Sequence, residues 1–212
     1  MVNQKRLVNT FLSLVKVKSI PKKERDVADL LKKILLKIGI RSFFDGAGRS
    51  IGGNCGNLYA LIKATDKKFP SVFLNAHMDT VEHKGDIRPV IRSGSIYSDG
   101  STILGADCKA GVAAILEAVR VMKEKKMPHG DIKLCFTVAE EIGLVGAKQV
   151  VKRHIDARYG LIMDGGSVEE IINRAPSQLS LEAKITGRAA HAGVRPEKGI
   201  NAIKVVSEAI SK

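Results

Sequence analysis

Short apolar strands and amphipathic helices alternate through most of this 212-residue chain, and their order is the feature that most limits its fold. Apolar runs typical of strands cover 57–64, 71–76, 131–138 and 159–163, and the strongest helical pattern lies at 108–126. This strand–helix–strand rhythm is typical of parallel strands joined by crossover helices. We therefore expect an α/β fold with a mainly parallel sheet and helices on both of its faces.

Further helices and strands are expected before, between and after these segments. Two helices are expected first, over 2–17 and from Pro21 to Gly39, and further segments follow along the chain: a strand at 41–44, a hairpin at 89–98 and a helix at 146–153. The pattern changes after Pro176, where a strand at 178–186 and a helix at 196–211 are expected. We therefore expect a catalytic-type domain over 1–175 and the beginning of a smaller α+β unit over 176–212, which is too small to bury a core alone.

The chain is strongly basic, with a formal net charge of +13 at pH 7. A charge of this size raises the question of a nucleic-acid partner, but the lysines are dispersed over several predicted helices. Aromatic residues make up only 4% of the chain and Trp is absent, so platforms for stacking bases are scarce. We expect solvated basic faces and no nucleic-acid partner.

The sequence patterns also indicate a cellular location. No apolar run approaches the roughly 20 residues that span a bilayer. The first helix is amphipathic and lacks the continuous apolar core of a signal peptide. Cys55, Cys108 and Cys135 form no C-x-x-C unit and cannot all pair, so reduced thiols are expected. We expect a cytoplasmic protein with no membrane partner.

His77 and Asp79 directly follow the apolar run at 71–76. Open α/β sheets bind ligands at the carboxyl ends of their strands, so these side chains lie where a site is expected. A lone His at a strand end is often only a hydrogen-bonded surface group. The nearby Asp79 changes this, because a metal-bound His usually donates its second ring nitrogen to a carboxylate.

Three acidic clusters follow at similar points, and each has an ordinary structural explanation. Asp107 precedes a predicted helix, where Asp is a favoured N-cap. Glu140 and Glu141 close a predicted strand and could be an exposed loop. Asp164 follows another strand in an Asp-Gly turn. Together with His77, these clusters predict a carboxylate-rich metal site suited to hydrolysis, in which one Glu binds metal and the other moves a proton.

Four segments of the chain, in order, resemble the peptidase T-like branch of the dizinc metallopeptidases, a family that also holds aminoacylases, acetylornithine deacetylase and glutamate carboxypeptidases. They are Asn75-Ala76-His77-Met78-Asp79-Thr80-Val81, Ile103-Leu104-Gly105-Ala106-Asp107-Cys108-Lys109-Ala110-Gly111, Thr137-Val138-Ala139-Glu140-Glu141-Ile142-Gly143-Leu144-Val145-Gly146-Ala147-Lys148 and Gly187-Arg188-Ala189-Ala190-His191-Ala192-Gly193. The resemblance implies a zinc-exopeptidase-like fold with a lid domain that begins near residue 176.

The resemblance also implies two zinc ions and a role for each candidate residue. His77 and Asp164 would bind one zinc, Asp107 would bridge both, and Glu141 would bind the other. Glu140 would be the general base. In addition, Asp79 would orient His77. His191, in the lid, would contact the substrate and stabilise the oxyanion, in relatives often from a partner subunit, which implies a homodimer through the lid.

This chain departs from the family pattern in two places. Cys108 stands where the family often has Asp. Asp107 already provides the carboxylate ligand, and the alternative is that Cys108 binds metal as a thiolate. The family's last zinc ligand, a His, lies in a C-terminal segment beyond residue 212, so the chain resembles the N-terminal half of such an enzyme, and weak or no catalysis by this chain is expected. The resemblance implies a peptidase acting on short peptides; the alternatives are a deacylase of N-acyl amino acids and a non-catalytic binding fragment.

Overall fold

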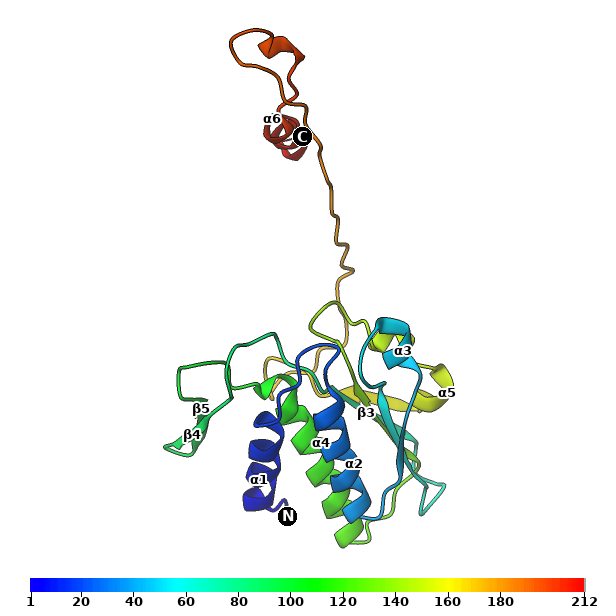
Figure 1. Ribbon diagram of the computed structural model, residues 1–212. Coiled ribbons are helices and arrows are strands. Elements are labelled where there is room, and N and C mark those ends of the chain that lie inside the picture. The colour runs from blue at the N-terminus through cyan, green and yellow to red at the C-terminus, as the bar shows by residue number, and fades with distance from the viewer. Residues whose placement is uncertain (212) are drawn as a thin grey trace. The chain divides into compact units, whose positions relative to one another are not determined.

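The computed structural model describes residues 1–211, which separate into two compact units (Figure 1). The first unit runs from Met1 to Glu170 and the second from Ile171 onward. The break therefore falls slightly before the boundary at 175 that the sequence pattern suggested.

A five-stranded sheet forms the centre of the first unit, in the order β1-β2-β6-β3-β7. Its strands are β1 (Ser42–Phe44), β2 (Leu58–Ile62), β3 (Val72–His77), β6 (Ile132–Thr137) and β7 (Tyr159–Ile162). β3 is parallel to both β6 and β7, whereas β2 is antiparallel to β6 and to β1. The predicted α/β fold is confirmed, and its parallel strands are those at the centre and one edge of the sheet. The hairpin β4 (Pro89–Arg92) and β5 (Ser95–Ser98) forms a separate two-stranded sheet, as predicted.

Three helices pack side by side against one face of the sheet (Figure 1). They are α1 (Gln4–Val15), α2 (Arg25–Lys37) and α4 (Ala106–Glu124). Their apolar stripes meet the inward side chains of β2 and β6 in one core, with Leu14, Leu31, Leu58, Leu116 and Leu134 among its most buried members. Burying each such side chain contributes about 1.5–3 kcal/mol, so this layer is the main source of stability.

The opposite face of the sheet has a thinner cover. The short helix α5 (Lys152–Ile155) places His154 against the rings of Phe43 and Tyr59, with ring centroids 5.2 and 5.0 Å away. Another short helix, α3 (Ala47–Ile51), lies within the Gly-rich loop. Helices therefore occur on both faces, but the face that α1, α2 and α4 cover holds most of the core.

Two helix predictions in the first unit were wrong in detail. The second helix begins at Arg25 and not near Pro21, because Lys22 adopts a left-handed conformation with φ 69°. The helix expected at 146–153 is a 3-10 turn, η1 (Ala147–Gln149), followed by α5. Val150 and Val151 between them are extended, as β-branched residues prefer.

The second unit is small and loosely packed among its described residues. The strand expected at 178–186 is absent there, and Leu179 and Leu181 are 80% and 86% exposed. A strand needs a neighbour to accept its backbone hydrogen bonds, and this unit provides only a single bridge between Arg188 and Ile200. A 3-10 turn, η2 (Pro196–Lys198), precedes the helix α6 (Ala202–Ile210). This helix begins later than predicted, because Asn201 caps its first turn through the amides of Ile203 and Lys204.

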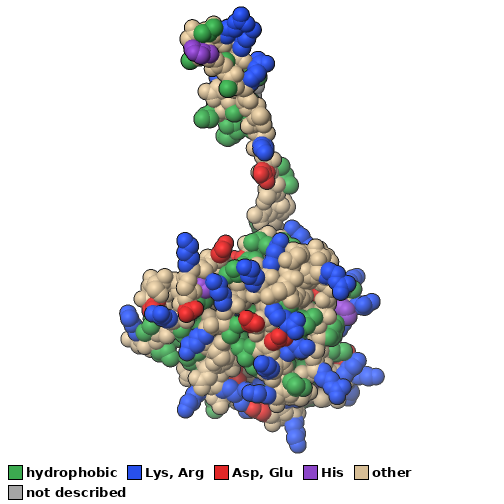
Figure 2. Space-filling view, in the orientation of Figure 1, with side chains coloured by type: hydrophobic (Ala, Val, Ile, Leu, Met, Phe, Trp, Pro, Cys, Tyr) green, Lys and Arg blue, Asp and Glu red, His purple; other side chains and the backbone are tan. Residues whose placement is uncertain are grey.

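The surface agrees with the dispersed charge of the sequence. Lys and Arg side chains are spread over the visible face of the first unit, between hydrophobic and neutral atoms (Figure 2). Among residues 1–211, no helix has both the length and the apolar character needed to cross a membrane.

Candidate metal centre

The parallel strands bring the candidate residues to one edge of the sheet. His77 ends β3 and pairs in register with Thr137 at the end of β6, and Asn75 pairs with Ile162 at the end of β7. Glu140 and Glu141 follow β6 after a tight turn, and Asp164 comes two residues after β7. The local sequence patterns therefore converge because parallel strands end at a common edge.

The side chains meet around the Nε2 atom of His77. This atom lies 3.0 Å from Asp107 Oδ1, 3.8 Å from Glu140 Oε2 and 3.9 Å from Asp164 Oδ1. His77 itself is only 2% exposed, whereas Asp107 is 73% exposed. One buried imidazole thus faces carboxylates that are open to solvent to different degrees.

These spacings suit a metal ion. Two ligands that bind zinc at 2.0–2.1 Å with a tetrahedral angle lie about 3.3 Å apart, close to the spacings around Nε2. Ligand-type atoms of His77, Asp107, Cys108 and Asp164 all lie within 4.8 Å of one another, and so do those of His77, Glu140 and Glu141. His, Asp and Glu are ordinary zinc ligands, so the residues present fit such an ion.

Asp79 connects the imidazole to the acidic turn. His77 Nδ1 lies 3.0 Å from the backbone carbonyl of Asp79 and 3.5 Å from its carboxylate. The carboxylate accepts hydrogen bonds from the amides of Glu140 and Glu141, at 3.1 and 3.2 Å. The backbone of Asp79 therefore makes the shorter contact with His77, while its side chain holds the turn that carries the two glutamates.

The crowded carboxylates perturb one another's protonation. Burial raises the pKa of Glu140, Glu141 and Asp164; His77 opposes this, and the neighbouring carboxylates raise the pKa further. Burial alone would lower the pKa of His77, but Asp79, Asp164 and Asp107 together raise it to about 9. Such mutual repulsion is what a bound cation relieves.

The ordinary explanations for Asp107 and Cys108 can be compared with their contacts. Asp107 has extended backbone angles, and its carboxylate contacts His77 with no bond to a helix amide among the described residues, so it is not a helix cap. Cys108 donates its thiol hydrogen to the carbonyl of Met163 at 2.7 Å, and burial raises the pKa of this thiol to about 12. A protonated thiol bound to a carbonyl is a poor metal ligand.

His191 belongs to the second unit. It is exposed, and its Nδ1 accepts a hydrogen bond from the amide of Gly193 at 3.1 Å. Its role in contacting substrate stays a prediction.

Three buried polar residues around the site were missed by the sequence analysis: Glu24, Asn57 and Lys109. Lys109 is 1% exposed and donates to the carbonyl of Val17 at 2.9 Å, and burial lowers its pKa to about 8. Only its place two residues after Asp107 could have drawn attention to it. Glu24 and Asn57 carry no local signal, because their partners lie far away in sequence.

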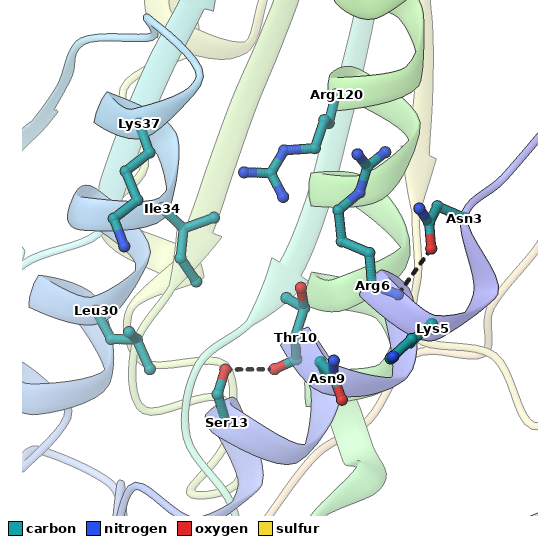
Figure 3. A pocket seen from close by; sticks show the side chains of 10 residues that line it. All are labelled: Asn3, Lys5, Arg6, Asn9, Thr10, Ser13, Leu30, Ile34, Lys37 and Arg120. Carbon is teal, nitrogen blue, oxygen red and sulfur yellow. Dashed lines mark hydrogen bonds between the residues drawn. The ribbon is translucent and has the colours of Figure 1, made fainter.

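A separate groove of about 510 Å³ opens between α1, α2 and α4 (Figure 3). Lys37 and Arg120 border it above the apolar side chains of Leu30 and Ile34. Arg6, also at its edge, is bound to Glu117 and Glu124 at 2.7 and 2.6 Å. None of the candidate metal ligands lines this groove, so it is distinct from the metal centre.

Comparison with solved structures extends over the whole chain. The aminopeptidase PepT of Bacillus cereus matches with a TM-score of 0.79 and 39% identity, over 100% of this chain and 57% of that one. A tripeptidase of Staphylococcus aureus matches with a TM-score of 0.83 and 34% identity, over the same shares.

Sequence comparison agrees with the structures. The Bacillus subtilis protein YqjE is 44% identical over 100% of this chain and 57% of its own length. Peptidase T of Escherichia coli is 41% identical over 53% of this chain and 27% of its own length. The chain therefore spans little more than half of YqjE and about a quarter of peptidase T. Residues 73–211, which include every candidate site residue, match the profile of peptidase family M20/M25/M40. The chain belongs to that peptidase family.

Proposed function

We propose that this chain carries the zinc site of a metal-dependent peptidase that cleaves amide bonds of short peptides. One observation carries the proposal: a buried His77 faces Asp107, Glu140 and Asp164 within 4 Å at the carboxyl edge of the sheet. Relatives that match its full length are called an aminopeptidase and a tripeptidase, which favours short peptides over N-acyl amino acids.

Each ligand has a proposed place. His77, Asp107 and Asp164 would hold one zinc ion, and Asp107 and Glu141 would hold a second. Zinc bound there would polarise the substrate carbonyl and lower the pKa of a coordinated water. Since the first position has three ligands from this chain and the second has two, we expect one zinc to bind more tightly.

Glu140 is the proposed general base. Its carboxylate is 25% exposed and lies 3.8 Å from His77 Nε2, so it borders the site without being sealed from solvent. Burial raises its pKa, which suits a group that accepts a proton near neutral pH. Glu140 would take a proton from the attacking water and return it to the amine as the carbon–nitrogen bond breaks.

The test compares zinc binding with hydrolysis. Calorimetric titration of the chain should show one strong zinc site. Hydrolysis of tripeptides and of N-acetyl amino acids is then measured for the chain and for any longer protein that its reading frame encodes. Hydrolysis of tripeptides that Glu140→Gln removes, with zinc binding retained, supports the proposal. Cleavage of acyl amino acids alone would point to the deacylase, and zinc binding without any hydrolysis to a binding protein.

A further inference from the structure

The turn that carries Glu140 and Glu141 is held by buried side chains from other segments. Four successive amides donate outward: Val138 to Asn57 Oδ1 at 3.1 Å, Ala139 to Glu24 Oε1 at 2.9 Å, and Glu140 and Glu141 to Asp79 at 3.1 and 3.2 Å. The three accepting side chains are all 0% exposed. Every amide from the end of β6 to Glu141 therefore depends on a side chain that is distant in sequence.

The turn needs this support because of its backbone conformation. Ala139 has φ 51°, in the left-handed region that costs a non-glycine residue roughly 1–2 kcal/mol. Such a conformation persists only where the surroundings impose it. The reversal at Ala139 directly precedes Glu140, so it determines where the Glu140 carboxylate meets His77.

Glu24 is the least expected of the three supports. It precedes α2, but its side chain makes no cap hydrogen bond to that helix. Instead, its Oε1 accepts from the amides of both Lys22, at 2.8 Å, and Ala139, at 2.9 Å. Both residues have left-handed backbones, with φ 69° and 51°. A single carboxylate oxygen thus ties together two strained turns.

The segment around Glu24 is anchored against the site at other points. The hydroxyl of Ser19 donates to the carbonyl of Met78, and the backbone carbonyl of Ser19 accepts from the amide of Thr80, both at 2.9 Å. Lys109 donates to Val17. The link between α1 and α2 therefore lies directly behind the ends of β3 and β6, which gives Glu24 a fixed base from which to reach Ala139.

We propose that Glu24 is a positioning residue for Glu140 and Glu141: its buried carboxylate sets the Ala139 turn and so places both glutamates for metal and substrate. Glu24 contacts neither. The inference rests on the proposed function, because it assigns Glu24 a purpose in that site. Burying a carboxylate whose Oε2 has no partner among the described residues is costly, and these amide bonds offset part of that cost.

Glu24→Ala and Glu24→Gln separate positioning from other effects. Glu24→Ala removes the acceptor, so amide hydrogen exchange at Ala139 in the metal-free chain should rise about tenfold or more. Calorimetry should show a fall of about 10–100-fold in affinity for the second, weaker zinc, which Glu141 would hold, as for other groups that orient ligands. Gln keeps an acceptor oxygen, so in Glu24→Gln both the exchange rate at Ala139 and the zinc affinity should stay within about threefold of wild type. If Glu24→Ala does not fold, Glu24→Asp replaces it, because its carboxylate is one methylene short of Ala139.

Glu117→Ala is the matched control. Glu117 is also buried and charged and accepts a backbone amide, that of Asn3 at 2.9 Å, but it joins α1 to α4. This variant should lower the thermal midpoint and leave zinc affinity unchanged. Unchanged exchange and affinity in Glu24→Ala would overturn the proposal, as would an equal loss of affinity in Glu117→Ala. If the unaltered chain binds no zinc, the proposed function fails, and the exchange at Ala139 still decides whether Glu24 holds the turn.

Discussion

The turn that carries Glu140 and Glu141 and the strand end that carries Asp164 supply carboxylates to the same site, but the protein holds them by different means. The turn rests on three fully buried side chains and on the central strand β6. Asp164 follows β7, an edge strand whose Leu161 and Ile162 are 50% and 69% exposed, and Asp107 is 73% exposed.

This difference indicates which half of the site is ordered before metal binds. Buried, fully bonded groups keep their positions because any movement leaves polar atoms unpaired. Exposed carboxylates, such as Asp107 at the start of α4 and Asp164 after the edge strand β7, move at little cost and gain order from the ion they bind. We infer a preorganised half around His77, Asp79 and Glu140, and a half around Asp107 and Asp164 that the metal completes.

The largest effect is expected from His77→Ala. His77 is one of the three ligands proposed for the tighter zinc position, and it also lies in the second group of ligand-type atoms, beside Glu140 and Glu141. Zinc affinity should fall by more than the roughly 10–100-fold typical of an outer-shell partner. Titration calorimetry measures this, with His129→Ala as control, because His129 belongs to neither group of ligand-type atoms and its imidazole contacts the carbonyl of Gly130. Retained tight binding in His77→Ala would place the metal elsewhere.

Asp79→Ala tests the preorganised half directly. Two amides in a buried position would lose a charged acceptor, so the free energy of unfolding of the metal-free protein should fall by about 2–4 kcal/mol. Urea denaturation without metal measures this loss. Asp107→Ala is the matched comparison: its metal-free stability should fall by no more than about 1 kcal/mol, since the carboxylate is exposed although it contacts His77, while its zinc affinity falls. Equal destabilisation by both would erase the distinction between the halves.

The pKa of His77 predicts a pH dependence of stability in the metal-free protein. The folded pKa of about 9 lies above the ordinary 6.5, so the folded protein holds a proton that the unfolded chain has lost between these values. Stability is therefore full below pH 6.5 and decreases toward pH 9, by about 1.4 kcal/mol per pH unit. Chemical denaturation of wild type and His77→Gln at matched pH isolates this contribution, because other titrating groups, Lys109 included, cancel in the difference. A wild-type slope that equals that of His77→Gln would contradict the prediction.

The smallest effect is expected from Cys108→Ser. The thiol donates to Met163 and burial raises its pKa to about 12, so in the metal-free protein it is protonated. A serine hydroxyl can donate the same bond, and zinc affinity should change by less than about threefold. Cobalt substitution offers a second measurement, since a thiolate ligand adds an intense charge-transfer band. That band, together with a large loss of affinity in Cys108→Ser, would make Cys108 a ligand.

Much of this protein follows from local pattern. The apolar runs at 71–76, 131–138 and 159–163 became β3, β6 and β7. The run of β6 is buried, as a continuous apolar sequence predicts, whereas β7 is an exposed edge strand. His77, Glu140, Glu141 and Asp164 could be named in advance because each closely follows such a run, and Asp107 because it precedes a predicted helix. Strand ends and family motifs are local in sequence, so they can be recognised without knowledge of the fold. The helix expected at 146–153 was wrong in detail, because the two valines before the short helix at 152–155 are extended. The strand expected at 178–186 is absent, because the described residues of its unit provide no neighbouring strand to pair with it.

The sequence by itself determined the α/β class, the family motifs and the identity of the residues gathered at the sheet edge. Only the tertiary structure decided how they are held. Glu24 bonds Ala139 across 115 positions, and Asn57 bonds Val138 across 81. Neither contact leaves a local signature, because burial and hydrogen bonding of a polar side chain depend on what the folded chain places beside it.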